Sequence, residues 1–155
     1  MPSPKFVTDD MLALDNQFCF ALYSTSLAMT KTYKPLLDQL GITYPQYLVM
    51  LVLWQKDDVL VKTIGEKLFL DSGTLTPLLK RLEALALVNR ARDDHDERQV
   101  RITLTRAGRL LKRKARDIPP QVICASGHDQ ASLGLLRTEL LAMRHALIES
   151  GDKAD

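Results

Sequence analysis

The 155 residues suffice for one folded domain, and a content of 46% apolar and 26% charged residues is an ordinary globular composition. The chain has no run of about eighteen apolar residues, which argues against a membrane span. Residues Met1–Asp10 lack the basic and apolar stretches of a secretory signal, so we expect a cytoplasmic protein with no membrane partner.

Positive charge is concentrated in the middle of the chain. Residues 62–116 hold fourteen Lys or Arg and seven Asp or Glu, whereas the rest of the chain holds seven and twelve. Because Lys and Arg neutralise phosphates, this asymmetry favours a polyanionic partner for the middle third. The two cysteines, Cys19 and Cys124, form no CxxC pair, and a reducing cytoplasm argues against a permanent disulfide.

The first part of the chain predicts two helices. Apolar residues that recur mostly every four positions predict one long helix from Met11 to about Leu37. Gly41 ends this pattern, and Thr43 and Gln46 then form a capping box for a second helix over about 44–55. The apolar positions of the first helix are Leu14, Phe18, Leu22, Met29 and Tyr33.

Two shorter helices follow. A second capping box, Thr63 with Glu66, predicts a helix from 64 to about 69. Asp71 or Ser72 caps the next helix, although Pro77 leaves a later start at Thr76 open. Its apolar face consists of Leu75, Leu78, Leu79, Leu82 and Leu85, and the outward face holds Ser72, Thr74, Thr76, Lys80 and Arg81.

The remaining chain predicts a β-hairpin and further helices. Alternating residues over 88–92 and 99–104 flank a polar turn, and Thr105 caps a basic helix that lasts until Pro119-Pro120. This leaves Cys124 in an irregular segment. The last apolar seam fits one helix of a monomer but also a helical dimer interface, and it consists of Leu133, Leu136, Leu140, Met143 and Leu147.

Two short helices followed by a charged hairpin are typical of DNA-binding proteins. A helix fits the major groove, and an Arg on a narrow projection fits the minor groove, which makes Arg98 the candidate for the latter. The alternative is a solvated helix face and an ordinary turn. The pattern favours a mainly α fold with a small β-hairpin wing and double-stranded operator DNA as partner. The candidate DNA-binding residues are Ser72, Thr74, Thr76, Lys80, Arg81, Arg90, Asp96 and Arg98.

Across most of its length the sequence resembles the MarR family of bacterial regulators. The resemblance rests on Arg81-Leu82-Glu83 followed by Leu87-Val88, and on Asp96-x-Arg98 followed by Leu104-Thr105. It implies a homodimer of single domains, 1–155, with a winged helix-turn-helix over about 61–105 and helical dimerisation regions over about 11–60 and 106–150. It also implies that Asp96 pairs with Arg98 in the wing. Ala86 replaces a common glycine, so we expect a looser or differently shaped turn there.

Four segments resemble the organic hydroperoxide resistance regulators in particular. They are 15–20, 29–37, 42–47 and 70–77. This resemblance implies that Cys19 is oxidised by organic hydroperoxides, the inducers, and that Tyr33 and Tyr44 of the partner subunit support its thiolate. In a two-cysteine subset, Cys124 of the partner then resolves the sulfenic acid as a disulfide, after which the dimer leaves its operator.

The chemistry around Cys19 supports this resemblance only in part. No Lys or Arg lies within ten residues of Cys19, so groups from elsewhere must stabilise its thiolate. Phe18 and Phe20 make its surroundings apolar, which favours fatty or aromatic hydroperoxides over hydrogen peroxide. A thiol peroxidase lacks support, because no thioredoxin-like βαβ pattern is present, and we expect neither an enzyme nor a cofactor.

Two other kinds of sensor remain open. A metal sensor would use Cys124 and His128, with His145 downstream, although Gly127 makes this segment poorly helical, and we expect no metal site. A repressor released by a non-covalent phenolic or aromatic ligand is the main alternative to peroxide sensing.

Overall fold

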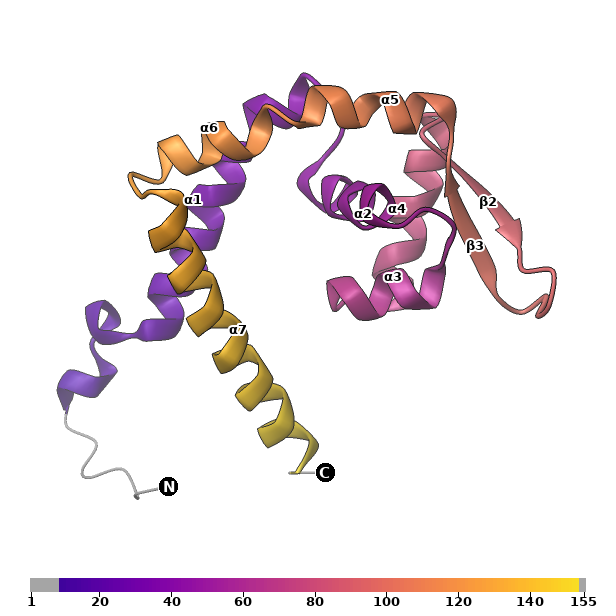
Figure 1. The fold of residues 1–155 in the computed structure, drawn as a ribbon. Coiled ribbons are helices and arrows are strands. Elements are labelled where there is room, and N and C mark those ends of the chain that lie inside the picture. The colour runs from indigo at the N-terminus through magenta and orange to yellow at the C-terminus, as the bar shows by residue number, and fades with distance from the viewer. Residues whose placement is uncertain (1–8, 154–155) are drawn as a thin grey trace. The chain divides into compact units, whose positions relative to one another are not determined.

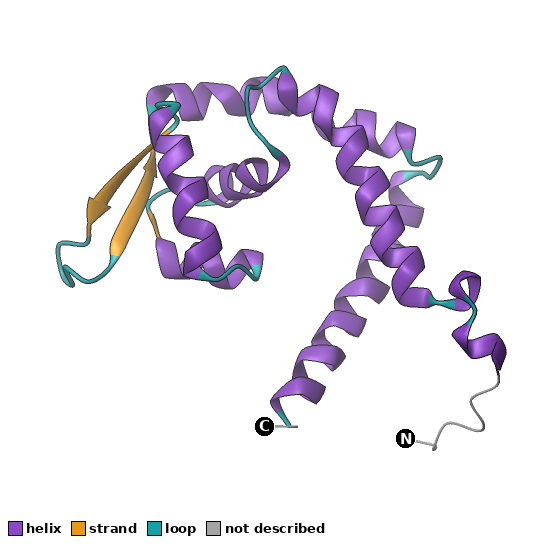
Figure 2. Cartoon of the chain, turned by 180° about the vertical axis from the view of Figure 1, so that it is seen from behind, coloured by secondary structure: helices purple, strands orange, loops and turns teal. Residues whose placement is uncertain are grey.

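The computed structural model describes residues 9–153, and the chain divides into two compact units, Met1–Arg116 and Asp117–Asp155. Helices make up most of the described chain, and the strands are confined to one small sheet (Figure 2). None of the helices in the described part is long and apolar enough to cross a membrane.

The first helix begins later than predicted. Two short 3-10 helices, η1 (Asp9–Leu12) and η2 (Leu14–Asn16), precede α1 (Phe18–Asp38). Asn16 donates its side-chain amide to the Asp10 carbonyl at 2.8 Å, and the Gln17 amide donates to the Met11 and Ala13 carbonyls. These side-chain bonds compete with helical backbone bonds, and Gln17 adopts an extended backbone. The predicted start at Met11 was therefore wrong, and Cys19 lies in the first turn of α1.

Helix α2 (Tyr44–Gln55) confirms the prediction for this segment. The Thr43 hydroxyl accepts from the Gln46 backbone N–H, and the Gln46 side chain accepts from the Thr43 backbone N–H at 2.9 Å. This reciprocal pair satisfies donors that the start of a helix otherwise leaves open. Val49, Met50 and Leu53 are fully buried in the core of the first unit.

A short strand changes the start of the third helix. Strand β1 (Val59–Leu60) leads directly into α3 (Val61–Leu68), and Leu60 is the N-cap residue without any side-chain cap. The predicted capping box at Thr63 was wrong, because pairing of β1 with the sheet fixes the chain before Thr63. Helix α4 (Ser72–Ala84) begins where predicted, with Pro77 inside it and the Asp71 carboxylate accepting from the Thr74 N–H at 2.7 Å.

The sheet is antiparallel with strand order β1-β3-β2. Strands β2 (Val88–Arg92) and β3 (Val100–Leu104) form the predicted hairpin, with Val88 opposite Leu104. β1 was not predicted, since two residues are too short for a periodic pattern. In Figure 1, α3 and α4 meet beside this hairpin, which projects away from the helices.

The turn after α4 is well formed. Ala86 has φ +57°, its N–H donates to the Glu83 carbonyl at 2.8 Å, and the Leu87 N–H donates to the Leu82 carbonyl at 3.0 Å. These two bonds make a Schellman motif, the usual way for a left-handed residue to end a helix. The expectation of a looser or differently shaped turn was wrong: alanine adopts the left-handed conformation that glycine favours.

The three C-terminal helices begin in different ways, and side chains cap two of them. Thr105 caps α5 (Arg106–Ala115) as predicted, by accepting from the Gly108 N–H at 3.0 Å. Pro119 and Pro120 lie in the first turn of α6 (Ile118–Ala125), where proline is tolerated because its missing N–H would have no helical partner. The irregular segment predicted around Cys124 is thus helical. Asp129 caps α7 (Gln130–Asp152), which holds the predicted apolar seam.

Candidate DNA-binding surface and thiol site

The outward face of α4 is polar along its length. Leu75, Leu78, Leu79 and Leu82 are buried on the opposite face, which fixes the rotation of the helix. Hydrogen bonds from the Thr74 backbone N–H and hydroxyl lower the pKa of the Asp71 cap, so this carboxylate is charged at neutral pH. Of the predicted DNA-binding residues on α4, Ser72, Thr74, Lys80 and Arg81 are exposed and Thr76 is half-buried.

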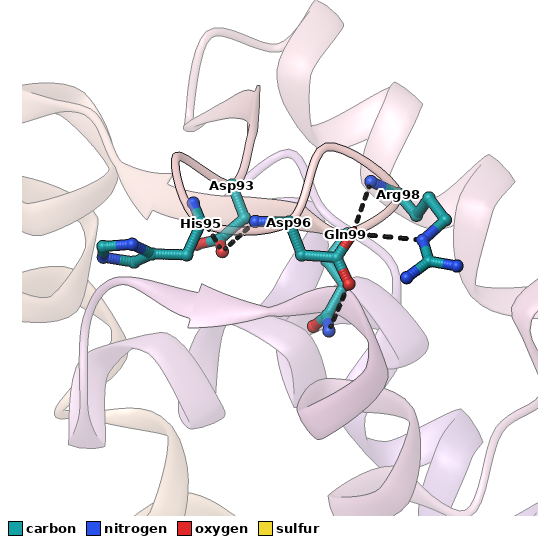
Figure 3. Close-up of polar contacts among 5 residues, drawn as sticks. All are labelled: Asp93, His95, Asp96, Arg98 and Gln99. Carbon is teal, nitrogen blue, oxygen red and sulfur yellow. Dashed lines mark hydrogen bonds and ion pairs between the residues drawn. The ribbon is translucent and has the colours of Figure 1, made fainter.

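The wing holds an ion pair at its turn (Figure 3). The Asp96 carboxylate accepts from the backbone N–H of Arg98 at 3.1 Å and from the Arg98 Nε at 3.2 Å. These hydrogen bonds, the backbone one first, lower the pKa of Asp96. The side chain of Arg98 is nevertheless 92% exposed. Asp96 thus orients a guanidinium that projects into solvent.

A second carboxylate, Asp93, organises the same turn and was missed in the sequence. Its Oδ2 accepts from the backbone N–H groups of His95 and Asp96 at 3.2 and 3.1 Å (Figure 3). Its Oδ1 lies 3.0 Å from the Arg101 Nε on β3, and its side chain is only 12% exposed. An Asp at the start of a polar turn is a signal for this arrangement, because its side chain imitates a backbone turn.

A cleft of about 840 Å³ lies between α3, α4 and the wing. Ser72 and Thr76 line it from α4, and Arg90, Arg98 and Gln99 line it from the wing side. The Arg90 Nε and the Gln99 Oε1 are buried and have no hydrogen-bond partner among the described residues. Buried polar atoms without partners are rare in folded proteins, so these two atoms are unusual features of the cleft lining.

Cys19 is the exposed second residue of α1. The Gln17 side chain is bonded to the preceding turns, and the first turn of α1 has neither a side-chain cap nor an acidic residue. The first turn of a helix carries partial positive charge from its unpaired N–H groups, which stabilises a thiolate. Cys19 therefore lies at the positive end of the α1 helix dipole. Cys124 is also exposed, and it lies near the end of α6, in the second unit.

Tyr33, far along α1 from Cys19, forms an aromatic cluster with Tyr44 of α2. Their ring centroids are 4.9 Å apart, and Tyr47, which the sequence analysis missed, lies 5.8 Å from Tyr33. Burial, with smaller contributions from Tyr44 and Tyr47, raises the pKa of Tyr33 to about 12, and burial also raises the pKa of Tyr44 and Tyr47. All three phenols are therefore protonated donors at neutral pH.

Within one chain, Tyr33 and Cys19 do not meet. They lie fourteen positions apart on α1, which corresponds to about 21 Å at 1.5 Å per residue. Among residues 9–153, moreover, no three His, Cys, Asp or Glu side chains lie close enough together to hold a metal ion.

Comparison with known sequences identifies related regulators. The profile of the family described as transcriptional regulator SarA/Rot matches residues 31–115. The organic hydroperoxide resistance transcriptional regulator of Bacillus subtilis (strain 168) is 51% identical over 138 residues, covering 89% of this chain and 94% of that protein. The HTH-type transcriptional regulator TtmR of Methylorubrum extorquens (strain PA1) is 51% identical over 139 residues, covering 90% and 71%.

Solved structures of transcriptional regulators have a similar fold. AbfR of Staphylococcus epidermidis superposes with a TM-score of 0.74 at 36% identity, covering 91% of this chain and 97% of that one. Reduced AbfR bound to DNA gives a TM-score of 0.72 at 37% identity, covering 90% and 96%. AbfR has also been solved overoxidized on DNA and in a disulfide form. The chain therefore belongs to the MarR family of winged helix-turn-helix transcriptional regulators, within the branch of the organic hydroperoxide resistance regulators.

Proposed function

We propose that the chain is a cytoplasmic, peroxide-sensing repressor that binds operator DNA as a homodimer while Cys19 is reduced. Oxidation of Cys19 by an organic hydroperoxide then releases the DNA. The observation that carries this proposal is the exposed Cys19 thiol in the uncapped first turn of α1. The named role of the Bacillus subtilis relative, and the reduced, overoxidized and disulfide forms of AbfR, support it.

The surroundings of Cys19 favour organic over inorganic peroxides. Phe18 and Phe20 flank it on α1, and these residues are 55% and 40% exposed. An alkyl or aryl group buries apolar surface against these rings, whereas hydrogen peroxide has none to bury. We therefore expect cumene hydroperoxide to oxidise Cys19 faster than hydrogen peroxide does, and equal rates would contradict this preference.

A second copy of the chain would bring the tyrosines to Cys19. The separation of about 21 Å along α1 means that Tyr33 of the same chain does not serve its own Cys19. Protonated phenols of Tyr33 and Tyr44 from the partner would donate hydrogen bonds to the Cys19 sulfur. Exposed apolar side chains suited to a dimer interface occur on α1 (Phe18, Leu22, Leu27) and on α7 (Leu136, Leu140, Leu147).

The redox step is a two-electron oxidation. The Cys19 thiolate attacks the terminal peroxide oxygen, an S–O bond forms, the O–O bond breaks, and an alkoxide leaves and takes a proton to become an alcohol. The product is the Cys19 sulfenic acid. The Cys124 thiolate of the partner then attacks this sulfur, an S–S bond forms, and hydroxide leaves as water after protonation.

The DNA-binding region would span about residues 61–105. We place the outward face of α4 (Ser72, Thr74, Thr76, Lys80, Arg81) against the major groove and its flanking phosphates. The exposed Arg98, oriented by Asp96, would enter the minor groove, and Arg90 would contact the backbone from the cleft. The helical regions, about 11–60 and 106–150, would carry dimerisation.

The test compares operator binding by reduced protein, peroxide-treated protein and the Cys19→Ser variant. Only the treated wild type should leave the DNA. Release of peroxide-treated Cys19→Ser would contradict the proposal and favour a non-covalent ligand. A non-reducing gel of the treated wild type should show a covalent dimer that Cys124→Ser abolishes, and a persistent dimer band would reject Cys124 as the resolving residue.

A further inference from the structure

A continuous aromatic chain crosses from α1 through α2. Tyr33 on α1 packs against Tyr44 in the first turn of α2 and against Tyr47 one turn later. Tyr47 in turn meets Trp54, in the last turn of α2, edge to face with centroids 6.3 Å apart. Tyr47 is 3% exposed, so its ring is held on all sides. Because the rings are closely packed, a displacement of Tyr33 or Tyr44 also displaces the Tyr47 ring.

Trp54 connects this row of aromatic rings to α5. Its indole Nε1 donates to the Gly108 carbonyl at 2.9 Å, across 54 positions of sequence. The Lys112 Nζ returns a hydrogen bond to the Trp54 carbonyl at 3.0 Å. Two hydrogen bonds thus join the last turn of α2 to α5, and one of them comes from the indole N–H of Trp54.

Gly108 lies directly against Leu87, in the segment that joins α4 to β2. A Cβ added at Gly108 would come within 2.2 Å of the Leu87 carbonyl oxygen, so only glycine permits this approach. The same Leu87 carbonyl accepts from the Thr105 N–H at 3.1 Å, and the Thr105 hydroxyl donates to the Ala86 carbonyl at 2.7 Å. The first turn of α5 therefore bonds both to Trp54 and to the residues that join α4 to β2.

We propose that Trp54 is a positioning residue that couples the tyrosine cluster to the recognition helix α4 and the wing through Gly108. Tyr44 and Trp54 lie at opposite ends of one helix, about 15 Å apart at 1.5 Å per residue. A movement of the Tyr44 end turns α2 as a rigid body, so it displaces the Trp54 end as well. The Trp54–Gly108 bond passes that displacement to α5, and Thr105 passes it to Ala86 and Leu87. The inference rests on the proposed function only for the origin of the movement, namely oxidation of the Cys19 to which these tyrosines would donate hydrogen bonds.

The test variant is Trp54→Phe in the full-length protein, which retains an aromatic ring but removes the Nε1 donor. The measured quantity is the ratio of operator Kd values for oxidised and reduced protein. We expect this ratio to fall by at least about fivefold, the lower end of typical allosteric couplings. The operator Kd of the reduced variant and its rate of Cys19 oxidation should stay close to the wild-type values. An unchanged Kd ratio would overturn the inference.

Ile64→Val is the matched control. Ile64 is fully buried in α3 and is not a member of the aromatic chain, and the change removes one methylene from the core. It should leave the Kd ratio unchanged. A fall of the ratio in this control equal to that in Trp54→Phe would overturn the inference, because any loss of stability would then weaken the response.

A second measurement does not depend on peroxide. Trp54 is the single tryptophan of the chain, so intrinsic fluorescence reports on this residue alone. Because coupling between two sites is reciprocal, operator binding to the reduced wild type should change the Trp54 emission. Unchanged emission would overturn the inference. If the emission changes but peroxide releases no DNA, the coupling stands and the proposed sensing function fails.

Discussion

Replacing Ala86 with glycine should stabilise the first unit. Ala86 ends α4 with φ +57°, a conformation that costs an L-residue about 1–2 kcal/mol because its Cβ crowds the backbone. The Schellman bonds from the Ala86 and Leu87 N–H groups hold the turn in this conformation. Ala86 is exposed, so the change removes little packing. Glycine relieves the crowding and keeps both bonds.

The expected gain is smaller than the full cost of the strain. Glycine has more freedom in the unfolded chain, which offsets about 0.4–1 kcal/mol. We therefore expect Ala86→Gly to raise the free energy of unfolding by about 0.5–1 kcal/mol. For a chain of this size, 1 kcal/mol corresponds to about 2–4 °C in Tm.

Urea titration of the wild type and two variants, at one protein concentration, measures this effect. Ala84→Gly is the matched control, because Ala84 is exposed and helical two positions earlier. There glycine should lower the free energy of unfolding by roughly 0.5–1 kcal/mol. The same substitution should thus have opposite signs at the two sites. Destabilisation by Ala86→Gly would refute the argument from backbone strain.

Three further predictions concern the sensor and the wing. Gln17→Asp places a negative charge beside Cys19 at the start of α1, so this variant should react with a thiol reagent more slowly at pH 7 than Gln17→Asn, and equal rates would exclude an electrostatic effect there. Asp93→Ala should loosen the wing and weaken operator binding by about tenfold, the value of one charge-assisted hydrogen bond, with unchanged helix content by circular dichroism. Because the pKa of Tyr33 is raised to about 12, the folded protein keeps a proton that the unfolded chain loses near pH 10. The free energy of unfolding should accordingly fall between about pH 10 and 12, less steeply in Tyr33→Phe, and an equal slope in both proteins would contradict this assignment.

Local signals were enough to place several helices. The Thr43 box and the caps at Asp71 and Thr105 each involve side chains within three positions of the helix start, so their geometry follows from the sequence. The hairpin likewise followed from alternation on both sides of a polar turn. These elements also place the candidate DNA-binding residues of α4 and the wing.

The errors arose where competing or distant contacts decide the structure. Periodicity extended α1 back to Met11, because it contains no information on the bonds from Gln17 to the preceding turns. Thr63 resembled a cap, but pairing of β1 with β3 starts α3 earlier. The link between Trp54 and Gly108 spans 54 positions, so only the folded chain brings those residues together.

The most direct test of the sensing mechanism titrates a preformed operator complex with cumene hydroperoxide. DNA release is followed by fluorescence anisotropy, and the oxidation state of Cys19 is followed by mass spectrometry of the same samples. We predict that release tracks Cys19 oxidation and is complete near about one equivalent of peroxide per protomer. DNA that stays bound to fully oxidised Cys19, or leaves while Cys19 is still reduced, would contradict the account.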